Sequence, residues 1–230
     1  MYFQHSNDIW RDFSELVAGV VSVSGIHRDV DVEPRLAPFN ARAEERLASS
    51  TEGELPEIQA WRRTFSKMGL KPTQYRCASE SLLRRFRKEG SLPRIHPLID
   101  LCNAVSLAYA TPIAVFDVSR IHEWLEVRYA AGSEEYLTFS GDVETPPEHE
   151  VIFADAAGKA HARRWTNRQS GLSAVRDDTA SVLIVAEAMH STAPADIEDL
   201  TATLARNLQA TWGAMLDTRV LDRAAPRFEF

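Results

Sequence analysis

The segment from Leu92 to Phe116, LPRIHPLIDLCNAVSLAYATPIAVF, constrains the fold more than any other part of the chain. From Ile95 to Phe116 the only charged residue is Asp100, and apolar side chains would cover most of a helix circumference. This pattern predicts a buried helix rather than a helix with one solvated face. Pro97 suits the first turn of that helix, and the Thr111-Pro112 pair is expected to end it.

Four polar residues interrupt this apolar segment at regular intervals. His96, Asp100, Asn103 and Ser106 are separated by four, three and three positions, which places their side chains along one side of the helix. Because burying polar groups is costly unless they are paired, such a line needs a reason. Two readings stay open: a hydrogen-bond network that joins the helix to its neighbours, or the wall of a ligand pocket.

The bulk properties describe an ordinary globular chain. Its 230 residues suffice for one sizeable domain, and no linker or repeat divides them, so a single domain over residues 1–230 is expected. No apolar run could span a bilayer, and the N-terminus lacks the pattern of a secretion signal, so we expect a cytoplasmic protein without a membrane partner. Cys77 and Cys102 are far apart and the histidines are scattered, which predicts neither a metal site nor a cofactor.

Charge is distributed unevenly along the chain. The net charge is −7, but residues 61–94 contain ten Lys or Arg against two Glu. This segment therefore carries +8 and leaves −15 on the remainder, so one face could attract phosphate while the rest repels it. A solvated helical surface without a partner would show the same pattern, so charge alone does not decide between the two.

The periodicity changes from helical to alternating after Pro112, which predicts an α+β fold with a mainly antiparallel sheet packed against several helices. Helices are expected near residues 9–16, 34–48, 55–68 and 77–89 and from 97 onward. Strands are expected at residues 17–26, 124–130, 135–139, 149–154, 161–165 and 180–186. The tail from Pro194 to Met215 has apolar residues at helical spacing, so an amphipathic C-terminal helix should close the domain.

The sequence lacks the motifs of the enzyme classes that are easiest to identify, including GxSxG, Walker, GxGxxG and CxxC motifs. Besides the helix line, two polar segments stand out. One is the turn at residues 130–135, in which Glu134 and Glu135 follow Gly132 and Ser133. The other is the segment 163–168, RRWTNR, which follows Ala162 and is followed downstream by Asp177-Asp178-Thr179.

Taken together, these segments resemble a known family. LPRIHPLIDLCNAVSLAYATPIAVFD, the VRYA strand that leads into GSEEY, then ARRWTNR and DDT, are similar to the B3/B4 editing domain of the phenylalanyl-tRNA synthetase β subunit, and most of all to its freestanding relatives. The resemblance covers residues 61–189, with extensions on both sides. No part of the chain resembles the catalytic domain of the synthetase.

The resemblance implies a freestanding aminoacyl-tRNA deacylase that acts in trans on the 3′-terminal aminoacyl-adenosine of a mischarged tRNA, such as canavanyl-tRNA(Arg), and not on DNA. It implies a pocket between the central helix and the sheet. Catalysis is assigned to Glu134, His96 and Asn103, which would position water and stabilise the oxyanion without a metal. The residues assigned to substrate binding are Asp100, Ser106, Gly132, Glu135, Trp165, Arg168 and Thr179.

Within this hypothesis Asp100 would pair with a cationic side chain, which favours canavanine over tyrosine. The residues assigned to tRNA phosphates are Arg84, Arg85, Arg87 and Lys88. Trp165 and Arg168 would stack on or clamp the terminal adenosine. Two alternatives remain open: a tRNA- or RNA-binding module without catalysis, and a protein that binds a small molecule or free amino acid.

Overall fold

The computed structural model describes residues 1–230 and contains six α-helices and twelve strands. The helices are α1 (Asn7–Asp12), α2 (Glu33–Ser49), α3 (Pro56–Lys67), α4 (Ala78–Glu89), α5 (Pro97–Tyr109) and α6 (Ala193–Trp212). The first strands are β1 (Tyr2–His5), β2 (Val17–Ser24), β3 (Ile113–Asp117), β4 (Trp124–Tyr129), β5 (Glu135–Leu137) and β6 (Val143–Glu144). The others are β7 (Val151–Asp155), β8 (Lys159–Arg163), β9 (Arg168–Gln169), β10 (Ser181–Ala188), β11 (Met215–Leu221) and β12 (Arg227–Glu229).

The strands form two sheets. The smaller sheet has the order β11-β2-β10-β3 and is antiparallel throughout, so β3 is an edge strand. The larger sheet has the order β12-β1-β4-β7-β8-β5-β6, with β9 paired to β8. Only the β1–β4 and β5–β8 pairs are parallel, so the prediction of an α+β fold with mainly antiparallel pairing is confirmed.

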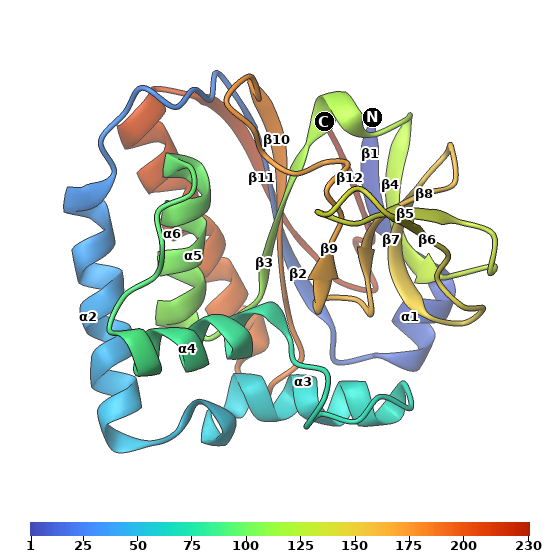
Figure 1. Cartoon of the computed structure of the whole chain (residues 1–230), viewed down its shortest axis with the longest axis horizontal. Helices are drawn as coiled ribbons and strands as arrows, with labels where there is room; N and C mark the ends of the chain where they lie inside the picture. The colour runs from blue at the N-terminus through green and yellow to red at the C-terminus, as the bar shows by residue number, and fades with distance from the viewer.

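The smaller sheet lies in the middle of the molecule (Figure 1). Helices α5 and α6 cover one face, with α2 outside them, and the larger sheet faces the other. Strand β10 shows why both faces are buried: Val182 and Ile184 point to the helices, whereas Leu183 and Val185 point to the larger sheet. A side chain at position 187 therefore lies on the face that looks toward the larger sheet.

The helices predicted near residues 34–48, 55–68 and 77–89 and from 97 onward are confirmed as α2, α3, α4 and α5, whereas α1 ends at Asp12 rather than near residue 16. Helix α5 is buried on nearly all sides, as its composition indicates. Helix α4 ends at Gly90, whose φ of 73° lies in the left-handed region. Close packing also depends on Gly19 in β2, where a Cβ would lie 2.1 Å from the hydroxyl oxygen of Thr201 in α6. No helix combines the length and the apolar character that crossing a membrane requires.

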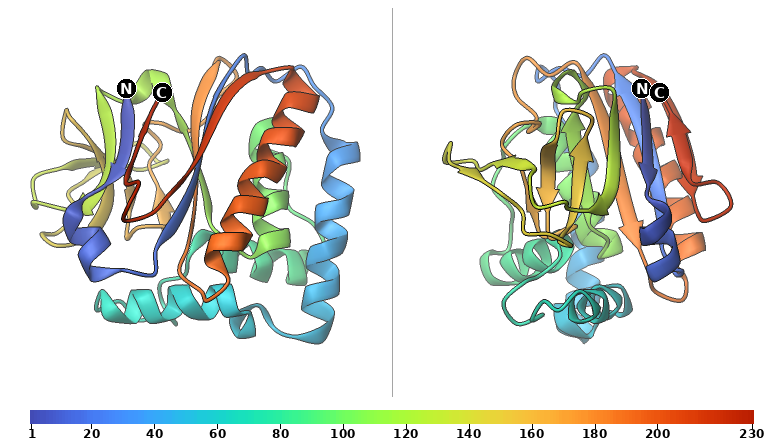
Figure 2. Two further views of the ribbon diagram at one scale, coloured as in Figure 1. Left: turned by 180° about the vertical axis from the view of Figure 1, so that it is seen from behind. Right: turned by 90° about the vertical axis from the view of Figure 1, so that its right-hand side faces the viewer.

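Several strands were not expected from the sequence. Strand β1 lies inside the larger sheet between β12 and β4, so the two ends of the chain meet (Figure 2). Strand β3 has only five residues, directly after the apolar helix. The expectation that a helix to Met215 closes the domain is wrong at its end: α6 stops at Trp212, and Gly213, with a φ of 60°, turns the chain into β11.

Candidate functional site

The polar line on α5 serves mainly to hold the helix and its flanking loops. His96 is the N-cap of α5, and its Nδ1 accepts a hydrogen bond from Leu98 N–H at 3.2 Å. Asp100 accepts from Ile95 N–H at 2.9 Å, and the Ser106 hydroxyl donates to the carbonyl of Thr111 at 2.7 Å. These three side chains are buried. A hydrogen-bond network that joins the helix to its flanking residues therefore accounts for the contacts of these three side chains.

The remaining member of the line, Asn103, is half-buried and shares a small cavity of about 20 Å³ with Asp100 and Asn40. Burial lowers the pKa of His96 and raises the pKa of Asp100, so both shifts favour the neutral forms. One water molecule already needs roughly 10–15 Å³ by this measure, so this cavity has no room for an amino acid. Catalytic or binding roles for these residues stay a prediction.

Glu134 lies in the turn between β4 and β5, within the larger sheet. Its carboxylate accepts hydrogen bonds from Ala131 N–H at 3.0 and 3.1 Å and from the Arg128 guanidinium. Burial acts to raise the pKa of Glu134, but these hydrogen bonds and the charge of Arg128 outweigh it and lower the pKa. The expectation that this turn adjoins α5 is wrong, because the smaller sheet separates them (Figure 1).

The neighbours of Glu134 also have structural contacts. Gly132 has a φ of 82°, which suits glycine in this turn. Glu135 is exposed and pairs with Lys159. Thr179 is buried, and its hydroxyl donates to Asp117 at 2.7 Å and accepts from Arg176 N–H at 2.9 Å. The structure does not bring these residues together with the helix line, and their functional roles stay predictions.

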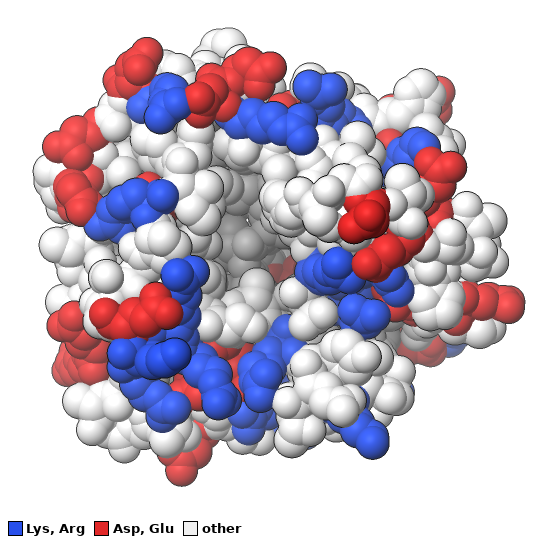
Figure 3. All heavy atoms as spheres, in the orientation of Figure 1, with Lys and Arg blue, Asp and Glu red and all other residues white.

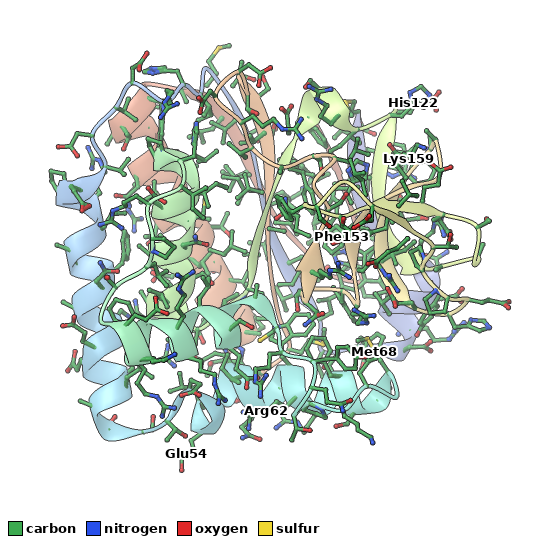
Figure 4. All side chains as sticks on the ribbon, viewed as in Figure 1. Glu54, Arg62, Met68, His122, Phe153 and Lys159 are labelled. Atoms are coloured by element: carbon green, nitrogen blue, oxygen red, sulfur yellow. The ribbon has the colours of Figure 1, made fainter.

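A different cavity lies where the two sheets meet. It is lined by the edge strand β3, by β10, by Phe153 and Ala162 of the larger sheet, by residues 165–169 and by Ala78 at the start of α4. Its volume is about 60 Å³. Figure 4 labels Phe153 in this central region between the sheets. Trp165 and Arg168, both predicted from the sequence, contribute to its wall, but the Trp165 indole is completely buried and is therefore not free to stack on an adenosine.

Glu187 is the carboxylate of this cavity. It belongs to β10, is only 1% exposed and points toward the larger sheet. Its Oε1 lies 2.8 Å from Nε1 of Trp165, which donates to it, and 2.7 Å from Nε2 of His5. Glu187 was not predicted from the sequence as a site residue. The available signal was that it is the only charged residue in the apolar run Ser181–Ala188.

Trp165 is held in an uncommon backbone conformation. Arg164 and Trp165 have φ values of 47° and 56°, in the left-handed region that non-glycine residues rarely adopt. The indole is completely buried and packs edge-on against Phe13 and Trp61, with ring centroids 4.8 and 5.2 Å apart. Such strain persists only where surrounding contacts enforce it, and it is frequent at functional sites.

The rest of the wall is polar. The Gln169 side chain donates to the carbonyl of Val115 at 2.6 Å, and the Asn167 side chain donates to the carbonyl of Arg76 at 2.7 Å. Both amides therefore keep their carbonyl oxygens for other partners. The N-terminus of α4 meets the wall at Ala78, whose N–H donates to the carbonyl of Thr166. A helix N-terminus favours negative charge, such as that of an oxyanion.

The face around this region is hollowed at its centre, and Lys and Arg side chains gather along the lower rim (Figure 3). Helix α4 supplies Arg84, Arg85, Arg87 and Lys88, all exposed. Arg84 and Arg87 lie 3.9 and 3.1 Å from Glu52, and Arg85 lies 2.8 Å from Glu89. These ion pairs neutralise part of the charge, whereas Lys88 takes part in no ion pair.

Two other clusters have the residue types of active or metal sites. Nδ1 of His161 lies 2.8 Å from the Ser173 hydroxyl, and its Nε2 lies 3.2 Å from Asp155. Ser173 and His161 have no exposed surface, so this Ser-His-Asp arrangement is a core network without access for a substrate.

Glu57, His190 and Asp196 form the second cluster, with potential ligand atoms within 4.8 Å of one another. Arg46 donates to both carboxylate oxygens of Glu57 at 2.7 and 2.8 Å, and Nε2 of His190 lies 2.7 Å from Asp196. A divalent cation would have to displace the Arg46 guanidinium from Glu57. The carboxylate of Glu57 is therefore already neutralised by the chain's own cation.

Comparisons with known proteins agree with the resemblance noted in the sequence. The phenylalanine–tRNA ligase β subunit of Mannheimia succiniciproducens is 24% identical over 169 residues, which cover 70% of this chain and 21% of that protein. The β subunit of Coxiella burnetii is 30% identical over 104 residues, which cover 45% of this chain and 13% of that protein. The chain thus spans about a fifth or less of the length of these relatives.

A solved N-terminal fragment of the phenylalanyl-tRNA synthetase β subunit from Pyrococcus horikoshii is similar with a TM-score of 0.47 and 10% identity. This match covers 93% of this chain and 49% of that chain. The model of the B3/4 domain family matches residues 60–200, which include Glu187, Trp165 and all of α4 and α5. Because this match extends over more than half of the chain, the chain belongs to the B3/4 domain family.

Proposed function

We propose that this protein is an aminoacyl-tRNA deacylase that acts in trans in the cytoplasm, on canavanyl-tRNA(Arg) or another tRNA misacylated with a cationic or hydrogen-bond-donating amino acid. The observation that carries the proposal is the buried carboxylate of Glu187 in the wall of the cavity between the two sheets. The cavity lies within the segment that matches the B3/4 family. The proteins that are similar to this chain include phenylalanine–tRNA ligase β subunits, and this similarity supports a link to tRNA.

The size and charge of the cavity support an amino acid as the bound group. With about 60 Å³ it has several times the roughly 10–15 Å³ that one water needs, which leaves room for the end of an amino-acid side chain. A nucleoside would not fit and would stay in the open hollow. A buried carboxylate binds most favourably to a ligand that brings a hydrogen-bond donor or a positive charge, because a buried charge without a partner is costly. In this proposal Glu187 has the role that the sequence suggested for Asp100.

Hydrolysis requires little covalent machinery here, because an aminoacyl ester is already activated. A water oxygen attacks the carbonyl carbon, the bond from that carbon to the ribose oxygen breaks, and the ribose oxygen takes a proton. The free amino acid and the tRNA are the products. The carbonyl oxygens of Asn167 and Gln169 are suited to hold the water, and the N-terminus of α4 is suited to face the oxyanion.

The tRNA would be held by phosphate contacts to α4. This helix begins at the cavity wall with Ala78, and its basic residues follow from Arg84 to Lys88. At a rise of about 1.5 Å per residue, they lie roughly 9–15 Å from the cavity along the helix axis. When the aminoacyl end of a tRNA enters the cavity, the nucleotides that precede the terminal adenosine would therefore lie beside these basic side chains.

The decisive experiment is a deacylation panel with tRNAs that carry canavanine, arginine, tyrosine and an uncharged aliphatic residue. Three variants are compared: Glu187→Gln, Glu134→Gln and the exposed-site control Glu45→Gln. We expect Glu187→Gln to slow release of the cationic amino acids at least tenfold, because a charge-assisted hydrogen bond is lost. Selective loss in Glu134→Gln instead would place the site in the β4–β5 turn.

Two results would replace the proposal. Salt-sensitive tRNA binding without release of any amino acid would favour an RNA-binding module. Binding of a free amino acid that persists when the basic residues of α4 are neutralised would favour a small-molecule-binding protein. Unlike these alternatives, the deacylase requires both the α4 surface and Glu187.

A further inference from the structure

The N-terminal strand contacts the buried carboxylate of Glu187 although it lies outside the segment that matches the family. The match covers residues 60–200, whereas β1 comprises Tyr2–His5. Strand β1 runs parallel to β4, with His5 opposite Val127. This register directs His5 into the core beside Glu187, across 182 positions of sequence.

His5 and Glu187 form a pair that is shielded from water. Their side chains are 0% and 2% exposed, and Nε2 of His5 lies 2.7 Å from Oε1 of Glu187. The imidazole packs edge-on against Phe3 and Trp10, with ring centroids 5.2 and 4.9 Å away. These contacts fix the orientation of the ring, so His5 has little freedom to leave the carboxylate.

The hydrogen-bond partners define which imidazole nitrogen carries the proton. Nδ1 of His5 is buried without a partner. A protonated Nδ1 would leave an unsatisfied N–H donor, which is costlier than an unused lone pair. The neutral ring with hydrogen on Nε2 satisfies the geometry and donates to Glu187. Together with the Trp165 indole, two neutral donors then converge on Oε1, and Oε2 is left for a ligand.

We propose that His5 is a positioning residue that makes Glu187 selective for amino acids with a cationic or donor-bearing side chain. This inference rests on the proposed function of the cavity. His5 and Trp165 occupy Oε1 from inside the protein, which leaves Oε2 for a ligand in the cavity. Without His5 the carboxylate loses one of its two donors, and its remaining oxygen is no longer held toward the ligand.

The test uses binding rather than turnover, so that it does not depend on hydrolysis. Two amide-linked analogues, 3′-arginylamino- and 3′-norvalylamino-deoxyadenosine, resist cleavage and differ in the side-chain donor. Calorimetry gives Kd for each, and the ratio of the two values measures selectivity. We expect the unmodified full-length protein to prefer the arginyl analogue roughly tenfold to a hundredfold, which is the range of one charge-assisted hydrogen bond.

The variants separate positioning from packing. His5→Gln retains a donor near the place of Nε2 and should keep the ratio within about threefold. His5→Leu and His5→Asn, which lack a donor at that reach, should each reduce it at least fivefold, mainly by weakening the arginyl analogue. Ile9→Ala removes buried side-chain volume from the same N-terminal region and should leave the ratio unchanged. Because His5→Asn remains polar, it carries the test if His5→Leu fails to fold.

The outcomes distinguish this inference from the proposed function. An unchanged ratio in His5→Asn, or an unmodified protein that binds both analogues equally, would overturn the role of His5 even if esters are hydrolysed. Selective binding that His5→Asn abolishes would support it even if no aminoacyl-tRNA is cleaved, and in that case only the deacylase proposal would fall.

Discussion

Two tryptophans donate hydrogen bonds to the same residue, which allows a sharp test of the charged cavity. The Trp165 indole donates to the carboxylate of Glu187 at 2.8 Å, and the Trp61 indole donates to its backbone carbonyl at 3.3 Å. Both indoles are fully buried and contact each other. Replacing either one by Phe keeps an aromatic ring and removes one donor.

The structure predicts different costs for the two substitutions. A hydrogen bond to a charged group contributes about 1.5–3 kcal/mol, whereas a neutral one contributes about 0.5–1.5 kcal/mol. The smaller ring leaves a similar void in both variants, so this cost cancels in the comparison. Trp165→Phe should therefore destabilise the protein by about 1–2 kcal/mol more than Trp61→Phe.

Urea denaturation followed by circular dichroism measures this difference, provided that the slope against urea stays the same in both variants. Deacylation of the cationic substrate provides the second readout and should fall in Trp165→Phe but not in Trp61→Phe. Equal losses of stability would refute the reasoning, because they would show that the hydrogen bond from Trp165 to the side chain of Glu187 is no stronger than the one from Trp61 to its backbone carbonyl.

Three further predictions concern other parts of the molecule. Burial acts to raise the pKa of Asp155, but hydrogen bonds from His161, Lys159 N–H and His122 N–H outweigh it and lower the pKa. The ionised carboxylate therefore stabilises the fold fully above the unfolded pKa of about 3.9, and this stabilisation is lost as pH falls through the folded pKa. Urea titrations should show that the loss of unfolding free energy in Asp155→Asn shrinks below about pH 4, and a loss that stays constant with pH would contradict this. Glu123 has a φ of 61° and an exposed side chain, so Glu123→Gly should raise the free energy of unfolding by roughly 0.5–1 kcal/mol, and a thermal melt that shows a loss would contradict the strain. Changing Arg84 and Arg87 together to Gln should lower the slope of log affinity for tRNA against log salt by about two, whereas the control Arg219→Gln on β11 should not change it.

The helices were predictable because their signals are local. The apolar spacing of α3, α4 and α5 spans ten or more residues each, and capping residues such as Gly90 mark their ends. Among the unexpected strands, β1, β3, β6, β9 and β12 have two to five residues each, too few for a period of two to stand out, whereas β11 has seven residues that are mostly exposed. Their positions depend on pairing with distant strands, such as β1 with β4, and no local pattern encodes that.

The polar line on α5 was identified correctly as a feature, but its main use was not predictable. His96 and Asp100 use their side chains for backbone N–H groups at the start of α5. A helix start that is buried must satisfy these donors, and side chains of this kind do so. The same residue types would serve a ligand equally well, so spacing alone leaves both readings open.

The candidate site itself is assembled from segments that are far apart in the chain. Glu187 comes from β10, its two donors come from β1 and from the loop after β8, and the facing wall comes from Phe153 and Ala162 of the larger sheet. In the sequence Glu187 is one acidic residue in an apolar strand, and nothing near it specifies a partner. Only the alternation of β10, which turns Leu183 and Val185 to the same side, shows that this carboxylate must face the other sheet. A buried charge at that position requires donors from the facing layer, so the search for a site in such a chain should begin with the single charged residue of a buried strand rather than with a row of polar residues on a helix.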